Sequence, residues 1–207
     1  MVKYKRLDIK AGNIRSLDSV LNKWNKILHK YLEKTHYWDC HWWHIERAIL
    51  SSFAAAVWLN DGIALEEYSE EKKIKNQNRT YTGRCDLYFE IGKQGFVCEA
   101  KKITCGIGGK SKKSNTIDLV KRGLKEACND ARDLLDDSGR RLGMCFVVPR
   151  LPKAQIKNKD KPIIEFQEII KEKIDYSSIA MVFPQKTEDL NTERYHYPGV
   201  VLLIKEV

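Results

Sequence analysis

The chain has 207 residues, of which 43% are hydrophobic and 31% are charged. This length suggests one domain with a substantial core, and this composition excludes a chain that is disordered throughout. The longest mostly apolar stretch, residues 49–59, is shorter than the roughly 20 residues of a membrane span, and the N-terminus lacks the apolar segment of a secretory signal. We therefore expect a cytoplasmic protein with no membrane segment, whose six cysteines are reduced and mostly buried.

Positive charge is concentrated in the middle of the chain. The formal net charge is +9, and residues 101–161 carry 16 Lys and Arg against 7 Asp and Glu, which accounts for the whole excess. Such a concentration is typical of proteins that bind the phosphate backbone of nucleic acids, because each neutralised phosphate releases counterions. A solvated basic surface is the alternative explanation.

The first half of the chain is predicted to form two helices followed by strands. Apolar residues recur at helical spacing over residues 17–34, with Ser16 as the N-cap, and again over residues 42–60, where an Asp-Gly pair ends the helix. A short strand near 63–68 and a loop come next. Two longer strands, 80–91 and 94–103, are joined by a glycine-rich hairpin turn.

Helices and strands alternate in the second half. After a loop rich in Gly, Ser and Lys at 104–115, the pattern predicts helices at 116–137 and 163–174, and strands at 142–148, 179–183 and 199–204, with a basic loop at 149–162. This order predicts an α/β fold with a mixed central sheet that contains an antiparallel hairpin and is flanked by helices on both faces. We expect one domain, 1–207, with residues 1–40 as an N-terminal helical addition.

The hairpin carries the most informative group of side chains. Apolar and polar residues alternate along its first strand, which places Asp86 on the polar face. Glu99 and Lys101 share a face of the second strand because they are two residues apart. If the turn is centred between Lys93 and Gln94, Asp86 lies opposite Lys101 and diagonal to Glu99.

These residue types suit a magnesium site. Two neighbouring carboxylates repel, and the pKa of one rises unless a cation lies between them. Magnesium prefers carboxylate oxygens and retains several waters, and a nearby lysine can orient an attacking water or stabilise a phosphoryl oxygen. A salt-bridge cluster on a half-exposed hairpin is the alternative.

Glu46 is a candidate third acidic group. It lies in the apolar stripe of the second predicted helix, four residues after Trp42 and three before Ile49. A carboxylate that faces a core is costly unless it is paired or bound to a metal. In the alternative, Glu46 lies at the edge of the stripe and reaches solvent or pairs with a lysine.

Taken together, the segment GRCDLYFEIGKQGFVCEAKK, with Asp86 and the triplet Glu99-Ala100-Lys101, resembles the signature of the PD-(D/E)xK restriction-endonuclease-like nucleases. In that family the Asp and the ExK triplet lie on a central hairpin, and a preceding helix often supplies a further Glu, which Glu46 matches. The order of predicted elements over residues 42–183 is similar to the family's order. Cys85 stands where many members have proline.

The resemblance implies a Mg²⁺-dependent endonuclease, with Mn²⁺ as a substitute, that hydrolyses DNA and leaves 5′-phosphate ends. It would act in restriction, defence or phage DNA processing. Asp86 and Glu99 would hold the ion together with the backbone carbonyl of Ala100, and Glu46 would bind it directly or through water. Lys101 would position the attacking hydroxide.

The implied partner is DNA, and a homodimer is expected because cutting both strands often needs two active sites. The basic residues expected to contact phosphates are Arg79, Arg84, Lys102, Lys110, Lys112 and Lys113. The alternative is a module of the same fold that binds nucleic acid or a partner protein without cutting.

Two other patterns compete with this interpretation. Residues 104–111 resemble a phosphate-binding P-loop, but Thr104 replaces the first glycine, and a helix that starts at 116 begins too late to face a phosphate. His36, Cys40 and His44 are residue types that bind zinc, yet along a helix they would span roughly 12 Å. The three tryptophans nearby favour a packed core or interface, or a surface on which single-stranded bases stack.

Overall fold

The computed structural model describes residues 7–12, 14–74, 79–109, 111–135 and 139–207. Its strands are β1 Leu7–Lys10, β2 Ile63–Lys73, β3 Thr80–Ile91, β4 Gln94–Gly106, β5 Arg140–Pro152, β6 Ser178–Val182, β7 Tyr195–His196 and β8 Val200–Glu206. Its helices are α1 Leu17–Lys34, α2 Glu46–Trp58, α3 Lys113–Asp133 and α4 Asp160–Lys173, with short 3-10 helices at His41–Trp43 and Lys153–Asn158. Within these residues, no helix is both long and apolar enough to cross a membrane.

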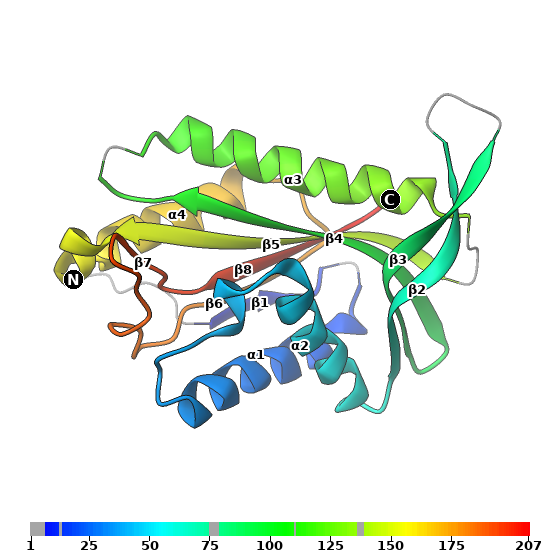
Figure 1. Ribbon diagram of the computed structural model, residues 1–207, viewed down its shortest axis with the longest axis horizontal. Helices are drawn as coiled ribbons and strands as arrows, with labels where there is room; N and C mark the ends of the chain where they lie inside the picture. The colour runs from blue at the N-terminus through cyan, green and yellow to red at the C-terminus, as the bar shows by residue number, and fades with distance from the viewer. Residues whose placement is uncertain (1–6, 13, 75–78, 110, 136–138) are drawn as a thin grey trace.

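The described strands form one mixed, largely antiparallel sheet of eight strands. Their order is β1-β6-β8-β5-β4-β3-β2, and β7 pairs with β5 beside this path. β4 and β5 are parallel and are connected through α3, which lies over them (Figure 1). The α/β class, the mixed sheet and the helices on both faces agree with the sequence-based expectation.

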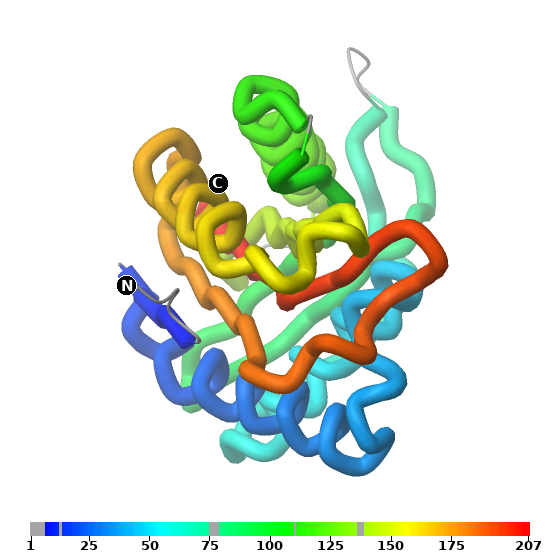
Figure 2. Tube along the Cα trace, turned by 90° about the vertical axis from the view of Figure 1, so that its left-hand side faces the viewer, coloured from blue at the N-terminus to red at the C-terminus, as the bar shows by residue number. Residues whose placement is uncertain are grey.

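The sheet separates two hydrophobic layers. α1 and α2 cover one face, where Trp24 of α1 packs with Phe146 of β5 and donates from Nε1 to Ser52 Oγ of α2 at 2.8 Å. α3 and α4 cover the other face, where Leu124 and Phe166 belong to a second apolar cluster. Figure 2 shows the two pairs of helices on opposite sides of the sheet. Because both faces are covered, the interior strands β5, β6 and β8 consist largely of buried apolar residues.

Within the segment 1–40, which we expected as an N-terminal helical addition, residues 7–10 contribute to the sheet and residues 14–40 to the core. β1 pairs antiparallel with β6 at one edge of the sheet. α1 buries its apolar side chains in the same cluster as α2 and the central strands.

Several element boundaries differ from the prediction. The second helix does not run from 42 to 60: a 3-10 turn ends at Trp43, the chain is extended at Ile45, and α2 begins only at Glu46. β2 continues to Lys73, where we expected a loop, because its pairing with β3 holds its charged residues in the ladder. The short strands β1 and β7 were not predicted.

The predicted hairpin register was wrong by two residues. Ile91 pairs with Gln94, so the turn consists of Gly92 and Lys93, and the ladder pairs Leu87 with Cys98. Gly92 has a φ of 64°, a conformation that glycine adopts without steric cost. A shift of two residues does not by itself exchange the two faces of a strand, but it moves Asp86 from the level of Lys101 to that of Glu99, just beyond the last pair of the ladder.

Candidate active site

The two hairpin strands separate at the residues that the sequence singles out. The β3–β4 ladder ends at the Leu87–Cys98 pair; before Leu87, β3 pairs with β2, and beyond Cys98, β4 pairs with β5. One edge of β4 therefore lacks a neighbouring strand there. Asp86 reaches across the gap, where its Oδ2 accepts a hydrogen bond from the Ala100 amide at 2.8 Å.

Glu46 approaches the same strand edge from the other side. It is the first residue of α2 and is half-buried, and its carboxylate accepts a hydrogen bond from the backbone amide of Lys102. Asp86 and Glu46 thus bind alternate amides of one strand edge. The fold brings Glu46 to the same strand edge as Asp86, although among the described residues no three His, Cys, Asp or Glu side chains, these acids included, form a group that could hold a metal ion.

The electrostatics of the carboxylates show how closely they interact. The pKa of Glu99 is raised to about 7: burial is the largest cause, the charge of Asp86 acts in the same direction, and Lys72 and Lys101 act against them. Burial also raises the pKa of Glu46, again with Asp86 acting in the same direction. Each acid is therefore harder to ionise than normal, which is the condition that a bound cation would relieve.

Lys72 is a member of the site that the sequence reasoning missed. Its Nζ lies 2.7 Å from Glu99 Oε1, and the two side chains are only 10% and 4% exposed. Hydrogen bonding and attraction to Glu99 raise the pKa of Lys72 even though burial acts against its charge. Lys72 belongs to β2, a strand that we expected to end before this residue. No sequence signal therefore placed Lys72 beside Glu99.

Lys101 is close to the acidic groups but has its own partner. Its Nζ lies 2.9 Å from Asp130 Oδ2 of α3. Burial lowers the pKa of this amine, but Asp130, Glu46 and Asp86 outweigh it, and the net shift is upward. Asp130 was not among the residues that the sequence predicted for this site.

The backbone is unusual beside Asp86. Glu67 of β2 lies level with Asp86 in the β2–β3 ladder and has a φ of 56°, in the left-handed region that few non-glycine residues adopt. Its carboxylate pairs with Arg47 of α2, at 2.7 Å, and with Arg84 of β3. Strained positions of this kind are concentrated at functional sites.

The basic residues predicted to contact phosphates lie in three places. Arg84 and Lys102 are beside the acidic groups, Arg84 paired with Glu67 and Lys102 donating to the carbonyl of His44. Arg79 is exposed next to the start of β3. The others belong to the segment after β4: Lys112 is exposed, Lys113 pairs with Glu165 at 3.1 Å, and Lys110 lies outside the described residues. Lys113 is the first residue of α3 and lies seven residues beyond the end of β4 at Gly106.

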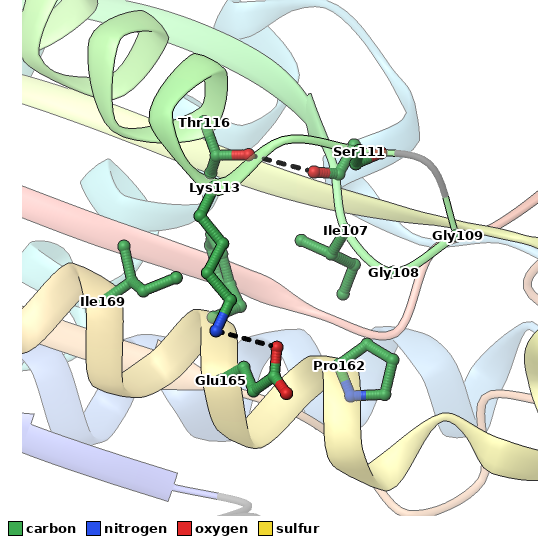
Figure 3. Close-up of a pocket in the computed structure, with 11 residues that line it drawn as sticks. Ile107, Gly108, Gly109, Ser111, Lys113, Thr116, Pro162, Glu165 and Ile169 are labelled. Atoms are coloured by element: carbon green, nitrogen blue, oxygen red, sulfur yellow. Dashed lines mark hydrogen bonds and ion pairs between the residues drawn. The ribbon is translucent and has the colours of Figure 1, made fainter.

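The P-loop-like stretch lines a separate pocket of about 270 Å³ between the loop after β4, the start of α3 and α4 (Figure 3). Gly108 and Gly109 have positive φ values, and Thr116 Oγ1 donates to the Gly106 carbonyl at 3.0 Å. The ammonium of Lys113 points to Glu165 across this pocket (Figure 3). Its charge is therefore already compensated by α4.

The residues considered for zinc are used in other contacts. Cys40 is fully buried, and burial raises its pKa far above the normal value of a thiol. His44 Nε2 lies 2.9 Å from Asp39 Oδ1, while His36 occupies a left-handed backbone position just after α1. Across the part of the chain that the structure describes, no three His, Cys, Asp or Glu side chains converge as metal ligands.

The acidic donors are chemically suited to a hard divalent cation. Asp86 and Glu99 supply carboxylate oxygens just beyond the Leu87–Cys98 pair, where β3 and β4 separate, and magnesium is usually bound by one or two carboxylates plus retained waters. Lys72 now supplies the positive charge beside Glu99. A cation that used both carboxylates would have to compete with this ammonium.

Comparisons of the chain with protein-family models, with curated proteins and with solved structures gave no match.

Proposed function

We propose that the protein is a metal-dependent nuclease that hydrolyses DNA phosphodiester bonds, with a site built like that of the PD-(D/E)xK nucleases. One observation carries the proposal: Asp86 and Glu99 lie level on strands that separate at this point, while Glu46 reaches the same strand edge from α2. A resemblance in sequence alone could arise by chance. The proximity of residues that are distant in sequence supports the nuclease proposal independently of that resemblance.

In this proposal Asp86 and Glu99 hold Mg²⁺, the carbonyl of Ala100 is a further donor, and Glu46 binds directly or through water. When bound, the ion would lower the pKa of a coordinated water and offset negative charge on the phosphoryl group. Lys101 carries its proton at neutral pH, since its pKa is raised. Its ammonium can donate a hydrogen bond to the attacking water and orient the lone pair of that water toward phosphorus.

Two neighbouring groups complete this assignment. Asp130 fixes the amine of Lys101 through their 2.9 Å contact and so limits its position before substrate binds. Lys72 holds Glu99 in place and compensates its charge. Arg84 and Lys102, the predicted phosphate contacts nearest the acidic groups, would then meet the strand that is cut.

The test is a cleavage assay on supercoiled plasmid, single-stranded DNA and branched DNA, with Mg²⁺ or Mn²⁺ and with EDTA. We expect metal-dependent nicking or cutting that Glu99→Gln or Lys101→Ala lowers by at least about a hundredfold. Matched controls are Glu168→Gln and Lys26→Ala, which change exposed residues on α4 and α1 and should cut normally. Circular dichroism verifies that each variant is folded.

A second function, binding without cutting, is favoured by one specific observation. Both key side chains, Glu99 and Lys101, already have charged partners in Lys72 and Asp130. If the pure protein cuts none of the substrates with either metal but retains DNA in a gel-shift assay, the nuclease proposal is wrong and this alternative replaces it.

A further inference from the structure

A second charged cavity lies between α3, the end of α4 and β8. It has a volume of about 320 Å³. Leu124, Cys128 and Ile174, all buried, form an apolar floor. The basic side chains that line it are Lys121, Lys125, Arg132, Lys173 and Lys205.

Positive charge in this cavity is partly compensated, since Lys173 Nζ lies 3.8 Å from Glu172 Oε2. Asp175 is the acidic residue among its lining, and Asp175 Oδ2 lies 2.5 Å from Lys205 Nζ. Within the described residues, Lys121 and Lys125 of α3 have no ion-pair partner, and Arg132 only donates to Asn129 at 3.2 Å. Several unpaired cations around one small hollow create a field that attracts a multivalent anion.

The cavity is separate from the candidate active site. Gly143 of β5 pairs with Glu99 on one side and with Lys205 on the other, so the two sites lie at the same level of the sheet. α3 runs between them, with Cys128 seated directly over Gly143. Lys101 contacts α3 through Asp130, whereas Lys205 belongs to the cavity on the other flank. The inference therefore does not depend on the proposed nuclease function.

We propose that this cavity binds a nucleotide unit, with its phosphates among the cations and its base against Leu124 and Ile174. The combination of an apolar floor with several cations fits a ligand that has a flat apolar part and a polyanionic part. The volume is at the small end of the range of about 300–1,000 Å³ that ligand pockets have, which suits one nucleotide rather than a longer segment. The unit would be either a free nucleoside polyphosphate or one nucleotide of a nucleic-acid strand.

The experiment measures binding of ATP and of inorganic tripolyphosphate by calorimetry, in EDTA so that no cleavage occurs. Both ligands carry three phosphates, and ATP has one negative charge fewer, so tighter binding of ATP would come from its adenosine. We expect both to bind, ATP at least about fivefold more tightly, with affinities that fall as salt increases. Lys125→Ala and Arg132→Ala should each weaken binding by about tenfold, since each removes a charge-assisted contact.

Lys26→Ala is the matched control because Lys26 is exposed on α1, on the opposite face of the sheet. It should bind ATP as the wild type does. A short single-stranded oligonucleotide is then added as a competitor of bound ATP. If it displaces ATP at a lower concentration than added ATP does, the unit belongs to a nucleic-acid strand. If it does not compete, the ligand is a free nucleotide. Absence of ATP binding at millimolar concentration, equal binding by the Lys125→Ala/Arg132→Ala variant, or equal affinity for tripolyphosphate would overturn the proposal.

Discussion

Glu99 and Lys72 form the most tightly balanced pair in the candidate site. Burial and the charge of Asp86 both oppose ionisation of Glu99, and the ammonium of Lys72, 2.7 Å away, opposes their effect. Because both side chains are buried, each charge would be energetically costly without the other. Loss of one partner of a buried pair costs more than loss of both.

Lys72→Met should therefore destabilise the protein by about 3 kcal/mol, because it leaves the Glu99 carboxylate buried without a cation. The double variant Lys72→Met/Glu99→Gln should recover part of this loss, since no charge is then left unpaired. Denaturant unfolding of the wild type, both single variants and the double variant measures the coupling. A double variant no more stable than Lys72→Met would contradict this account of the pair.

Asp130 should affect the position of the Lys101 amine rather than the stability of the fold. The two side chains are about one-third exposed, and ion pairs of that kind contribute little to folding. If the nuclease proposal holds, Asp130→Asn should lower the cleavage rate by about tenfold while unfolding free energy changes by less than about 1 kcal/mol.

Glu126→Gln is the control for Asp130→Asn, because Glu126 lies on the same helix in a weak pair with Arg122, at 4.0 Å. It should leave both the cleavage rate and the stability unchanged. An Asp130 variant that cuts at the wild-type rate would show that Asp130 does not position Lys101.

At the scale of elements, the position of α3 links the two charged sites. The helix crosses from β4 to the parallel strand β5 and packs on both. The helix backbone lies close to β5 at Gly143, where an added Cβ would lie 2.6 Å from the backbone nitrogen of Cys128. Glycine is needed there because the obstacle is backbone, which cannot rotate away.

Gly143→Ala should lift α3 from β5 and destabilise the fold by about 2–3 kcal/mol. Gly123→Ala in α3 is the comparison: the three atoms nearest to its Cβ would belong to the side chains of Ile103 and Cys145, which can rotate as backbone cannot. Alanine also favours a helix by about 1 kcal/mol over glycine. Thermal unfolding of both variants should show the larger loss for Gly143→Ala, and the reverse order would show that the helix can move freely.

At the scale of the whole molecule, stability should depend on a histidine far from both charged sites. His196 of β7 is fully buried, and burial, together with the charge of Lys159, lowers its pKa to about 4. In the unfolded chain its pKa is near 6.5. Between these values the unfolded state binds more protons than the native state, so the native state loses stability as pH falls.

The wild type should therefore lose up to about 3 kcal/mol more than His196→Asn between pH 6.5 and pH 4. Above pH 6.5 the contribution of this histidine is fully present, and the difference between the two proteins should be constant. Urea unfolding at several pH values measures both curves. Parallel curves from pH 7 to pH 4 would show that His196 does not titrate as described.

The sequence by itself determined the elements with strong periodicity and the faces of the second hairpin strand. The helix at 17–34 and the strand at 80–91 match their predicted bounds, because apolar spacing and turn residues are local signals. Along β4 the predicted alternation holds, since Cys98 and Ala100 belong to one apolar cluster and Val97 to another, but along β3 it fails at Asp86, because Cys85 packs with Val97 rather than with Leu87. The hairpin register could not be obtained in this way, since it depended on which residues formed the turn.

Only the tertiary structure decided which charges meet. Lys72 reaches Glu99 because β2 extends further along β3 than its charged sequence indicates, and Asp130 reaches Lys101 because α3 crosses over β4. The separation of β3 from β4, which opens a strand edge to Asp86 and Glu46, is equally a property of the assembled sheet. These contacts join residues 14 to 56 positions apart. A charged residue meets such a partner only after the chain has packed, so no local sequence pattern identifies the partner.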